Sequence, residues 1–389
     1  MFTSESVTEG HPDKLCDLIS DAVVDRFLRD DPFSRIIVEC AVAGGILFIA
    51  ARFASHAHVD IPEVARQTIG QVGYDDATFN PRDCTIVTSF TDLHPSARLA
   101  VDEGEMSEAE VERTVARNQA NVFGYACNQT AAFMPLPIWL SHKLARRLAT
   151  VRLFRQLDYL APDGTVQVGI EYRDRQPLRV HSVTVVASHK HERVSPRRLR
   201  DDIVQQVIEP VFAEEPLRPD PETVIAINPD GPFAIGGPAV HSGLTGRKNA
   251  VDTYGEYSRH SGSALSGKDP SRIDRVGAYA ARLAAKNVVA AGLAEECEVQ
   301  LSYSIGHAKP VSIQVETFGT NQIPEDEIVR RLRAVFDFRP AAIIRDLNLR
   351  HMPRIMRGGF YRRLAAYGQV GRMDIGLPWE AIHYAERLR

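Results

Sequence analysis

The stretch that decides the fold is CEVQLSYSI at residues 297–305, followed by VSIQVET at residues 311–317. Apolar side chains alternate in the first run, with Val299, Leu301 and Tyr303 on one face, which is typical of a strand with one buried side. Residues 271–291 before these runs and residues 325–337 after them have helical patterns. The sequence therefore predicts a helix, an antiparallel hairpin and a second helix.

This order of elements occurs three times along the chain. The first copy has helices over 12–29 and 62–72 around a hairpin at 36–54. The second has helices near 137–153 and 195–212 around strands at 166–172 and 178–187. Because the strands come in adjacent pairs, a doubly wound parallel sheet is disfavoured.

The predicted fold class is α+β, with three pseudo-symmetric helix/hairpin/helix units at residues 1–97, 112–222 and 223–389. Helices on one side of each sheet leave the other side to be buried against something else. This predicts a homodimer or a dimer of dimers.

The composition is that of a globular protein, with 44% apolar residues, 25% charged residues and a net charge of −4. Such a charge gives no electrostatic reason to bind nucleic acid or a membrane surface. The five cysteines are widely spaced, which predicts reduced thiols in the core. The N-terminus has no signal-peptide pattern and no apolar run of about 18 residues follows, so we expect a cytoplasmic protein.

Two glycine-rich stretches carry cations, GLTGRK at residues 243–248 and SGKDP at residues 266–270. Converging backbone N–H groups together with Arg247, Lys248, Lys268 and Arg272 predict a polyphosphate cradle. The alternative is a pair of turns with solvated basic residues. Neither stretch has the spacing of a Walker A loop.

Two other features have simple explanations. Residues 92–117 are acidic and have no apolar period, which predicts a linker or a mobile lid, and the sequence leaves open whether the loop 89–112 gates a site. The histidine pairs His56/His58 and His189/His191 could ligate a metal, but no partner cluster has zinc spacing, so we interpret them as surface residues.

Long phrases of the chain together resemble the S-adenosylmethionine synthetases. They are SESVTEGHPDK at 4–14, FGYA at 123–126, IGGP at 235–238, GLTGRK at 243–248, VDTYG at 251–255, SGKDP at 266–270 and PWE at 378–380. The resemblance covers nearly the whole chain and implies three α+β domains that exchange segments across the boundaries above. It also implies a dimer that buries flat sheet faces, with two active sites between subunits.

The family reaction implied by this resemblance is attack of the methionine sulfur on C5′ of ATP, which expels triphosphate for later hydrolysis. The implied catalytic residues are His11, Lys14, Lys248 and Lys268. The implied ATP and triphosphate contacts are Asp163, Phe233, Arg247, Lys248, Lys268 and Arg272. The implied cofactors are Mg²⁺ at Asp13 and Asp274 and K⁺ at Glu39. The expected partners are ATP and a small-molecule acceptor.

The departures from the family pattern cluster at the amino-acid end of the site. Arg52 stands where the family has a glutamate that holds the methionine ammonium, and His241 replaces an aspartate that also faces methionine. Asn118 replaces an acidic residue, and Thr165 stands at the position of a lysine. The polyphosphate and metal groups therefore remain, while the predicted acceptor-binding residues Arg52, Asn118 and His241 are changed.

Three interpretations follow from this contrast. The first is an adenosyltransferase whose acceptor is a non-standard methionine analogue, and the second is an ordinary S-adenosylmethionine synthase that uses L-methionine. The third is a catalytically silent nucleotide-binding paralogue, which the survival of Asp13, Lys14, Lys248, Lys268 and Asp274 argues against. The sequence leaves open the acceptor, the hydrolysis of triphosphate, and dimer against tetramer.

Overall fold

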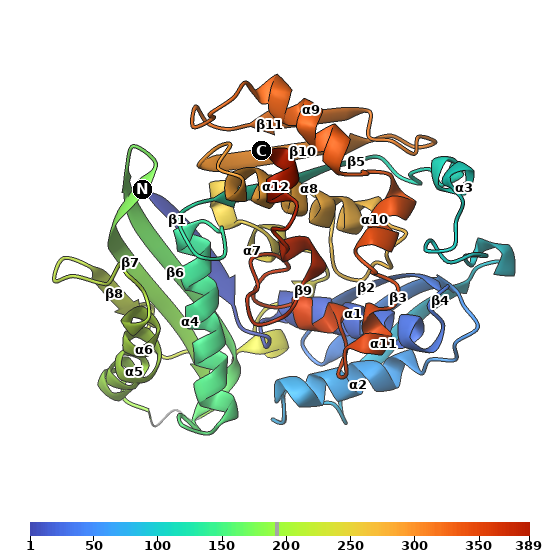
Figure 1. Ribbon diagram of the computed structural model, residues 1–389. Helices are drawn as coiled ribbons and strands as arrows, with labels where there is room; N and C mark the ends of the chain where they lie inside the picture. Colours follow the sequence, from blue (N-terminus) through green and yellow to red (C-terminus); the bar gives the residue numbers. More distant parts are fainter. Residues whose placement is uncertain (191–193) are drawn as a thin grey trace.

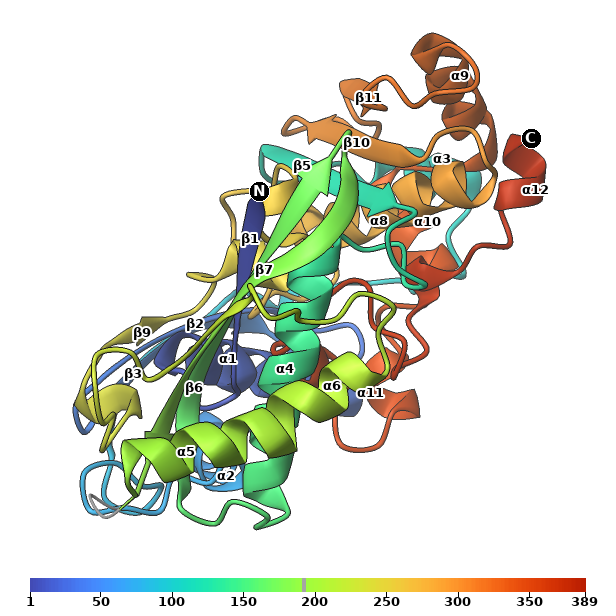
Figure 2. The same cartoon turned by 90° about the vertical axis from the view of Figure 1, so that its left-hand side faces the viewer.

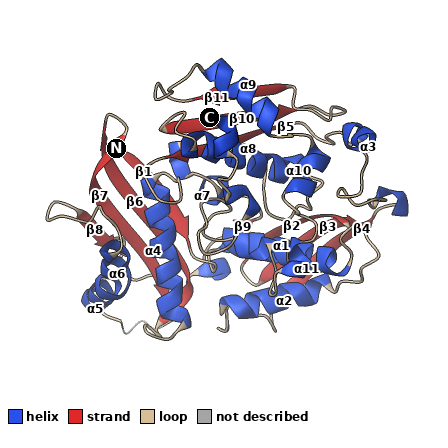
Figure 3. Ribbon diagram, viewed as in Figure 1, coloured by secondary structure: helices blue, strands red, loops and turns tan. Residues whose placement is uncertain are grey.

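The computed structural model describes residues 1–190 and 194–389 and contains three sheets, each with helices on one side (Figures 1 and 3). The predicted α+β class is confirmed, since hairpins and helices occur in all three units. His191 of the second histidine pair lies outside the described residues.

The first sheet has the strand order β4-β3-β2-β9. Its centre is the antiparallel hairpin of β2 (Arg35–Ala43) and β3 (Ile46–Ala54). Helix α2 (Ile61–Val72) provides the crossover that lets β4 (Thr85–Asp92) pair parallel with β3. Helix α1 (Pro12–Asp30) packs against β2, and the two-residue strand β9 (Gly243–Leu244) pairs with the other edge of β2.

The second sheet has the order β1-β6-β7-β8, with β1 (Phe2–Val7), β6 (Leu160–Arg173), β7 (Gln176–His189) and β8 (Val224–Ile227). Helix α4 (Leu136–Leu153) runs alongside it (Figure 2). Helices α5 (Pro196–Ile203) and α6 (Glu209–Ala213), joined by a π-helical turn, lead into β8, which pairs parallel with β7.

The third sheet has the order β11-β10-β5, with β5 (Ala120–Cys127), β10 (Glu296–Tyr303) and β11 (Ser312–Glu316). Helix α8 (Ile273–Ala290) covers β5 and β10, and α9 (Glu325–Val335) packs on β11. The chain ends in α10 (Pro340–Asp346), α11 (Met352–Ile355) and α12 (Ala385–Leu388). The first and third sheets share one hydrophobic core, and the second has its own.

The three units exchange their leading strands in a cycle. Strand β1 precedes α1 but pairs with β6 of the second sheet, and β5 precedes α4 but pairs with β10 of the third. Strand β9 precedes α8 and pairs with β2 of the first sheet. All three pairings are antiparallel, so each sheet is completed by a neighbouring unit.

The acidic segment 92–117 is tied to the rest of the chain at several points. The buried Glu103 carboxylate lies 2.6 Å from Arg350 Nε, and Arg98 forms a two-pronged ion pair with Asp31. Helix α3 (Glu108–Arg113) is held by Arg339. The predicted linker is therefore a packed segment whose carboxylates anchor it.

Two expectations about composition can be compared with the structure. All five cysteines are free and buried, which confirms the predicted core thiols. Among the described residues, no helix has the length and apolar character needed to cross a membrane.

Gly124 of β5 tests the packing of this strand on α8. A Cβ at Gly124 would lie 1.9 Å from the carbonyl carbon of Ala281, because the strand and the helix backbones touch. We expect Gly124→Ala to lower the free energy of unfolding by about 3 kcal/mol or more, since overpacking forces backbone shifts. Gly45→Ala is the matched control, because nothing lies within 4 Å of its added Cβ. Equal urea midpoints for the two variants would contradict the close approach.

Candidate functional site

Helix α1 carries four buried aspartates one turn apart, which we call the aspartate ladder: Asp13, Asp17, Asp21 and Asp25. Each accepts backbone N–H groups from distant loops. The donors are Leu244 to Asp13 (3.0 Å), Gly246 to Asp17 (2.7 Å), Gly267 to Asp21 (2.8 Å), and Tyr361 and Arg362 to Asp25 (2.9 Å each). Because buried carboxylates need such partners, the ladder fixes both glycine-rich loops on α1.

Lys14 belongs to the support of this ladder. Its ammonium is fully buried, with Nζ 2.9 Å from Asp17 and 2.5 Å from Asp252 of α7 (Asn249–Asp252). Burial alone would lower the pKa of Lys14, but the two carboxylates outweigh it and raise that pKa. In this geometry Lys14 holds Asp17 and Asp252 together, and its catalytic role stays a prediction.

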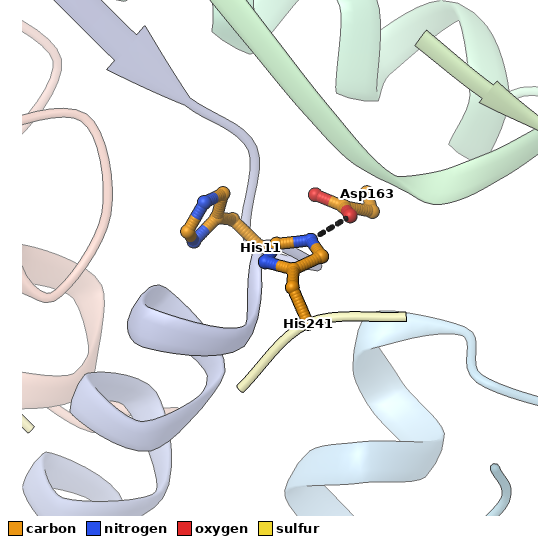
Figure 4. Close-up of side chains that lie close together, drawn as sticks. All are labelled: His11, Asp163 and His241. Carbon is orange, nitrogen blue, oxygen red and sulfur yellow. Dashed lines mark hydrogen bonds and ion pairs between the residues drawn. The ribbon is translucent and has the colours of Figure 1, made fainter. Parts of the chain in front are cut away.

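Three side chains from distant parts of the sequence meet beside the N-terminus of α1: His11, Asp163 and His241 (Figure 4). His241 Nε2 lies 2.7 Å from Asp163 Oδ2. The His11 and His241 rings pack edge to face, with their centroids 5.0 Å apart. The same Asp163 oxygen accepts the N–H of Gly237 at 2.8 Å. Gly237 has φ of 79° and its Cβ would overlap Tyr74, so this approach requires glycine.

His11 is a neutral imidazole near pH 7. Burial lowers its pKa to about 4, although the Asp163 and Asp13 carboxylates act in the opposite direction. Its Nδ1 accepts the N–H of Asp13 at 3.2 Å and so caps α1. The Nε2–H group therefore remains for another acceptor.

Three other residues that are predicted to bind the nucleotide lie near the cluster of His11, Asp163 and His241. Arg247 is largely exposed, with its guanidinium 3.9 Å from Asp13. The Lys248 ammonium lies 2.6 Å from Glu5 and close enough to influence His11. Phe233 is partly exposed, in a loop joined to the end of β7 beside Asp163. Together with His11, Asp13, Asp163 and His241, these three residues are called the first group.

A second group forms at the start of α8. Lys268 Nζ lies 3.1 Å from Asp274 Oδ2, and the Asn118 amide donates to the same oxygen at 2.9 Å. Asp274 Oδ1 and Asn118 Oδ1 are both buried without a hydrogen-bond partner in the described chain. Two such oxygens on contacting side chains fit a hard cation such as Mg²⁺. Burial lowers the pKa of Lys268, while the Asp274 carboxylate opposes that shift.

Asn118, which is predicted to bind the acceptor, contacts the predicted metal carboxylate Asp274, and its acceptor role stays a prediction. Arg272 is the residue that caps α8, two positions before Asp274. Sequence reasoning placed these residues in one site but did not predict the direct contact between Asn118 and Asp274.

The outer face of the first sheet carries the remaining predicted residues. In the pairing register Arg52 on β3 lies opposite Ile37 on β2, and Ile37 pairs in turn with Lys268. Arg52 and Glu39 are exposed on this face. So are four apolar side chains, Ile46, Phe48, Val87 and Leu244, at 54, 40, 45 and 48% exposure.

The two groups are separated along β2. Leu244 of the first glycine-rich loop pairs with Ala41, and Lys268 of the second pairs with Ile37. Four residues of strand correspond to roughly 13 Å. Within one chain, the first group and the second group therefore lie at two separate places.

The sequence of the chain is similar to sequences of known proteins over nearly its whole length. Sequence models of the S-adenosylmethionine synthetase N-terminal, central and C-terminal domains match residues 1–95, 113–233 and 235–381. The S-adenosylmethionine synthase of Thermosynechococcus vestitus is 46% identical over 98% of this chain and 95% of its own length. That of Synechococcus elongatus is 45% identical, covering 100% and 97%.

The chain therefore belongs to the S-adenosylmethionine synthetase family. It is an ATP-dependent adenosyltransferase of the methionine adenosyltransferase type.

Asp21 tests the aspartate ladder. Its carboxylate lies 2.8 and 2.6 Å from the two terminal nitrogens of the fully buried Arg275. We expect Asp21→Asn to lower the free energy of unfolding by about 3–5 kcal/mol, because it leaves a buried guanidinium without its counter-charge. The control is Asp30→Asn on the same helix, an exposed pair with Arg29 that we expect to matter by less than about 1 kcal/mol. Urea unfolding at one protein concentration compares them, and equal losses would show that the ladder is dispensable.

Proposed function

We propose that the chain transfers the adenosyl group of ATP to a thioether sulfur, with methionine as the acceptor, recognised mainly through its carboxylate. The observation that carries this proposal is the register that aligns Arg52 with Lys268, beside Asp274 and Asn118. A cation for the acceptor then lies across strand β2 from the cation and carboxylate assigned to triphosphate and metal.

In this reaction a sulfur lone pair forms a bond to C5′ of ATP while the C5′–O bond breaks. The bonding electrons leave with the triphosphate, and the sulfur becomes a sulfonium. Lys248, Lys268 and the neutral His11 Nε2–H stabilise the negative charge that develops on the leaving oxygen. No covalent intermediate with the protein is needed.

We assign the other positions by the family pattern together with their surroundings. Asp13 and Asp274 are the carboxylates for Mg²⁺, which when bound supplies positive charge to the phosphates, and the exposed Glu39 is the carboxylate for K⁺. The remaining nucleotide contacts are Asp163, Phe233, Arg247 and Arg272.

The proposed acceptor geometry follows from two substitutions. Arg52 is always positive, so it repels an ammonium and suits a carboxylate in a two-pronged contact. His241 donates from Nε2 to Asp163, which leaves Nδ1 with a lone pair that can accept from an ammonium. The names of the relatives, S-adenosylmethionine synthase, support methionine as the molecule that carries both groups.

A second candidate is a methionine analogue that lacks the amine. Arg52 in place of the glutamate implied by the family resemblance favours this analogue, because the change removes an attraction for the ammonium and adds a repulsion.

Acceptor analogues distinguish these cases. We expect kcat/KM of the wild type to fall about a hundredfold when the carboxylate of methionine is removed, since a screened contact of about 2.7 kcal/mol is lost. Removal of the amine of methionine should lower kcat/KM of the wild type by less than about tenfold. Arg52→Glu/His241→Asp should reverse this order, and Arg197→Glu, at a side chain that is 93% exposed, is the control.

Stronger dependence on the amine than on the carboxylate in the wild type, or an unchanged order in the double variant, would overturn the proposed recognition. A deaminated analogue that exceeds methionine would instead select the second candidate. Triphosphate, phosphate and pyrophosphate in the product mixture report whether hydrolysis follows transfer.

We also propose a homodimer as the smallest active unit. The outer face of the first sheet exposes four large apolar side chains next to Arg52 and Glu39, and a second copy would cover them. Pairing of two copies through this face would bring the first group of one chain toward the second group of its partner. Each active site would then use both chains.

Mixing of two inactive variants tests the shared site. His11→Ala disables the first group and Lys268→Ala the second, so each homodimer should have little activity. Random pairing of the two should restore about a quarter of wild-type turnover, because half of the dimers gain one intact site. Co-refolding followed by an activity assay measures this. Full turnover by a species that light scattering shows to be a monomer would contradict the dimer.

We assign the protein to the cytoplasm. The support for this is the state of its five cysteines, all free and buried, as is usual in a reducing compartment.

A further inference from the structure

We propose that His11, Asp163 and His241 form a binding site for a divalent transition-metal ion, separate from the magnesium carboxylates. One possible ligand atom from each residue lies within 4.8 Å of the others. Figure 4 shows His241 joined to Asp163 by a hydrogen bond, with the His11 ring beside them, and the three residues come from separate stretches of ribbon.

The donor set determines the class of ion. Two imidazole nitrogens and one carboxylate oxygen suit Zn²⁺, Fe²⁺, Co²⁺ or Ni²⁺, whereas Mg²⁺ prefers oxygen ligands alone. Metal to nitrogen distances are about 2.0–2.1 Å, so two ligands of one ion lie at most about 4.2 Å apart. The observed spacing needs only small side-chain rotations, and three protein ligands leave a coordination position open.

The surroundings support such an ion. His11 and Asp163 are 8% and 3% exposed, while the His241 side chain is 36% exposed, so an ion can enter past His241. Asp163 is already oriented by the N–H of Gly237. For His11 Nε2 to ligate, its proton must shift to Nδ1, which then gives up the Asp13 N–H, and the Asp13 carboxylate at 3.8 Å can accept the new N–H after a small movement.

Binding of the ion requires the proton of the hydrogen bond between His241 and Asp163 to move. In the structure a proton lies between His241 Nε2 and Asp163 Oδ2, which are 2.7 Å apart. The ion takes the place of this proton, which moves to Nδ1 of the same ring, so His241 ligates through Nε2 as a neutral imidazole and Asp163 ligates as a carboxylate. The inference does not depend on which acceptor the enzyme uses.

Titration with Co²⁺ tests the site directly. Untagged protein stripped with a chelator is titrated without ATP in a non-coordinating buffer, and visible absorption together with bound metal is measured. We expect one Co²⁺ for each chain, with d–d bands of a low-coordinate site. Stoichiometric Zn²⁺ should displace it, and an excess of Mg²⁺ should not. Absence of stoichiometric binding in the wild type would overturn the proposal.

Variants locate the ion. His241→Asp and His241→Asn should each weaken Co²⁺ binding by about tenfold or more, because each removes a nitrogen ligand. Both changes are at a partly exposed side chain, and circular dichroism checks that the variants fold. His56→Ala/His58→Ala, at an exposed pair, is the control and should bind as the wild type does. Unchanged affinity in both His241 variants, or loss of binding in the control, would rule out this site.

Discussion

Four carboxylates spaced one turn apart on α1 determine where the two glycine-rich loops lie. A buried carboxylate is tolerated only with hydrogen bonds or counter-charges, and the aspartate ladder takes its partners from backbone N–H groups of residues 244, 246, 267, 361 and 362. The loops can therefore not shift without leaving charge unpaired. Lys14 pairs with Asp17 and Arg275 pairs with Asp21 inside the protein, so the outward cations Lys248 and Lys268 stand on a rigid base.

The local elements could be predicted from the sequence because their signals are local. Alternation along residues 297–305 and the periodic apolar residues of α1 identified strands and helices close to their observed bounds. The family resemblance implies an exchange of segments, but the strands that take part could not be identified from the sequence, because β9 has only two residues and β1 pairs with a strand far along the chain. Short edge strands gain their order from the sheet they join, and this partner is set by tertiary packing.

The site residues that lie in sequence motifs could be predicted. The contacts between residues that the fold brings together from distant parts of the chain could not. The aspartates of α1 resemble a solvated helix face, because Leu15, Ile19, Val23 and Phe27 already supply an apolar face. Only the structure shows that both faces are buried. The signal in the sequence for their burial was that the four aspartates recur every four residues without lysines placed to pair with each of them on the helix surface. The contacts of Asn118 with Asp274, and of His11 with Asp163 and His241, join residues too distant in sequence for spacing to indicate them.

The cyclic strand exchange has a consequence for the order of synthesis. Strand β1 leaves the ribosome first, yet its neighbour β6 begins only at Leu160, and the first sheet lacks its last strand until Gly243 has been made. During translation the early sheets thus have unpaired edges, which are prone to wrong pairing. Only when the C-terminal unit has been made do all three sheets have their full set of strands. A chain truncated before this unit therefore also leaves the first sheet without one of its strands.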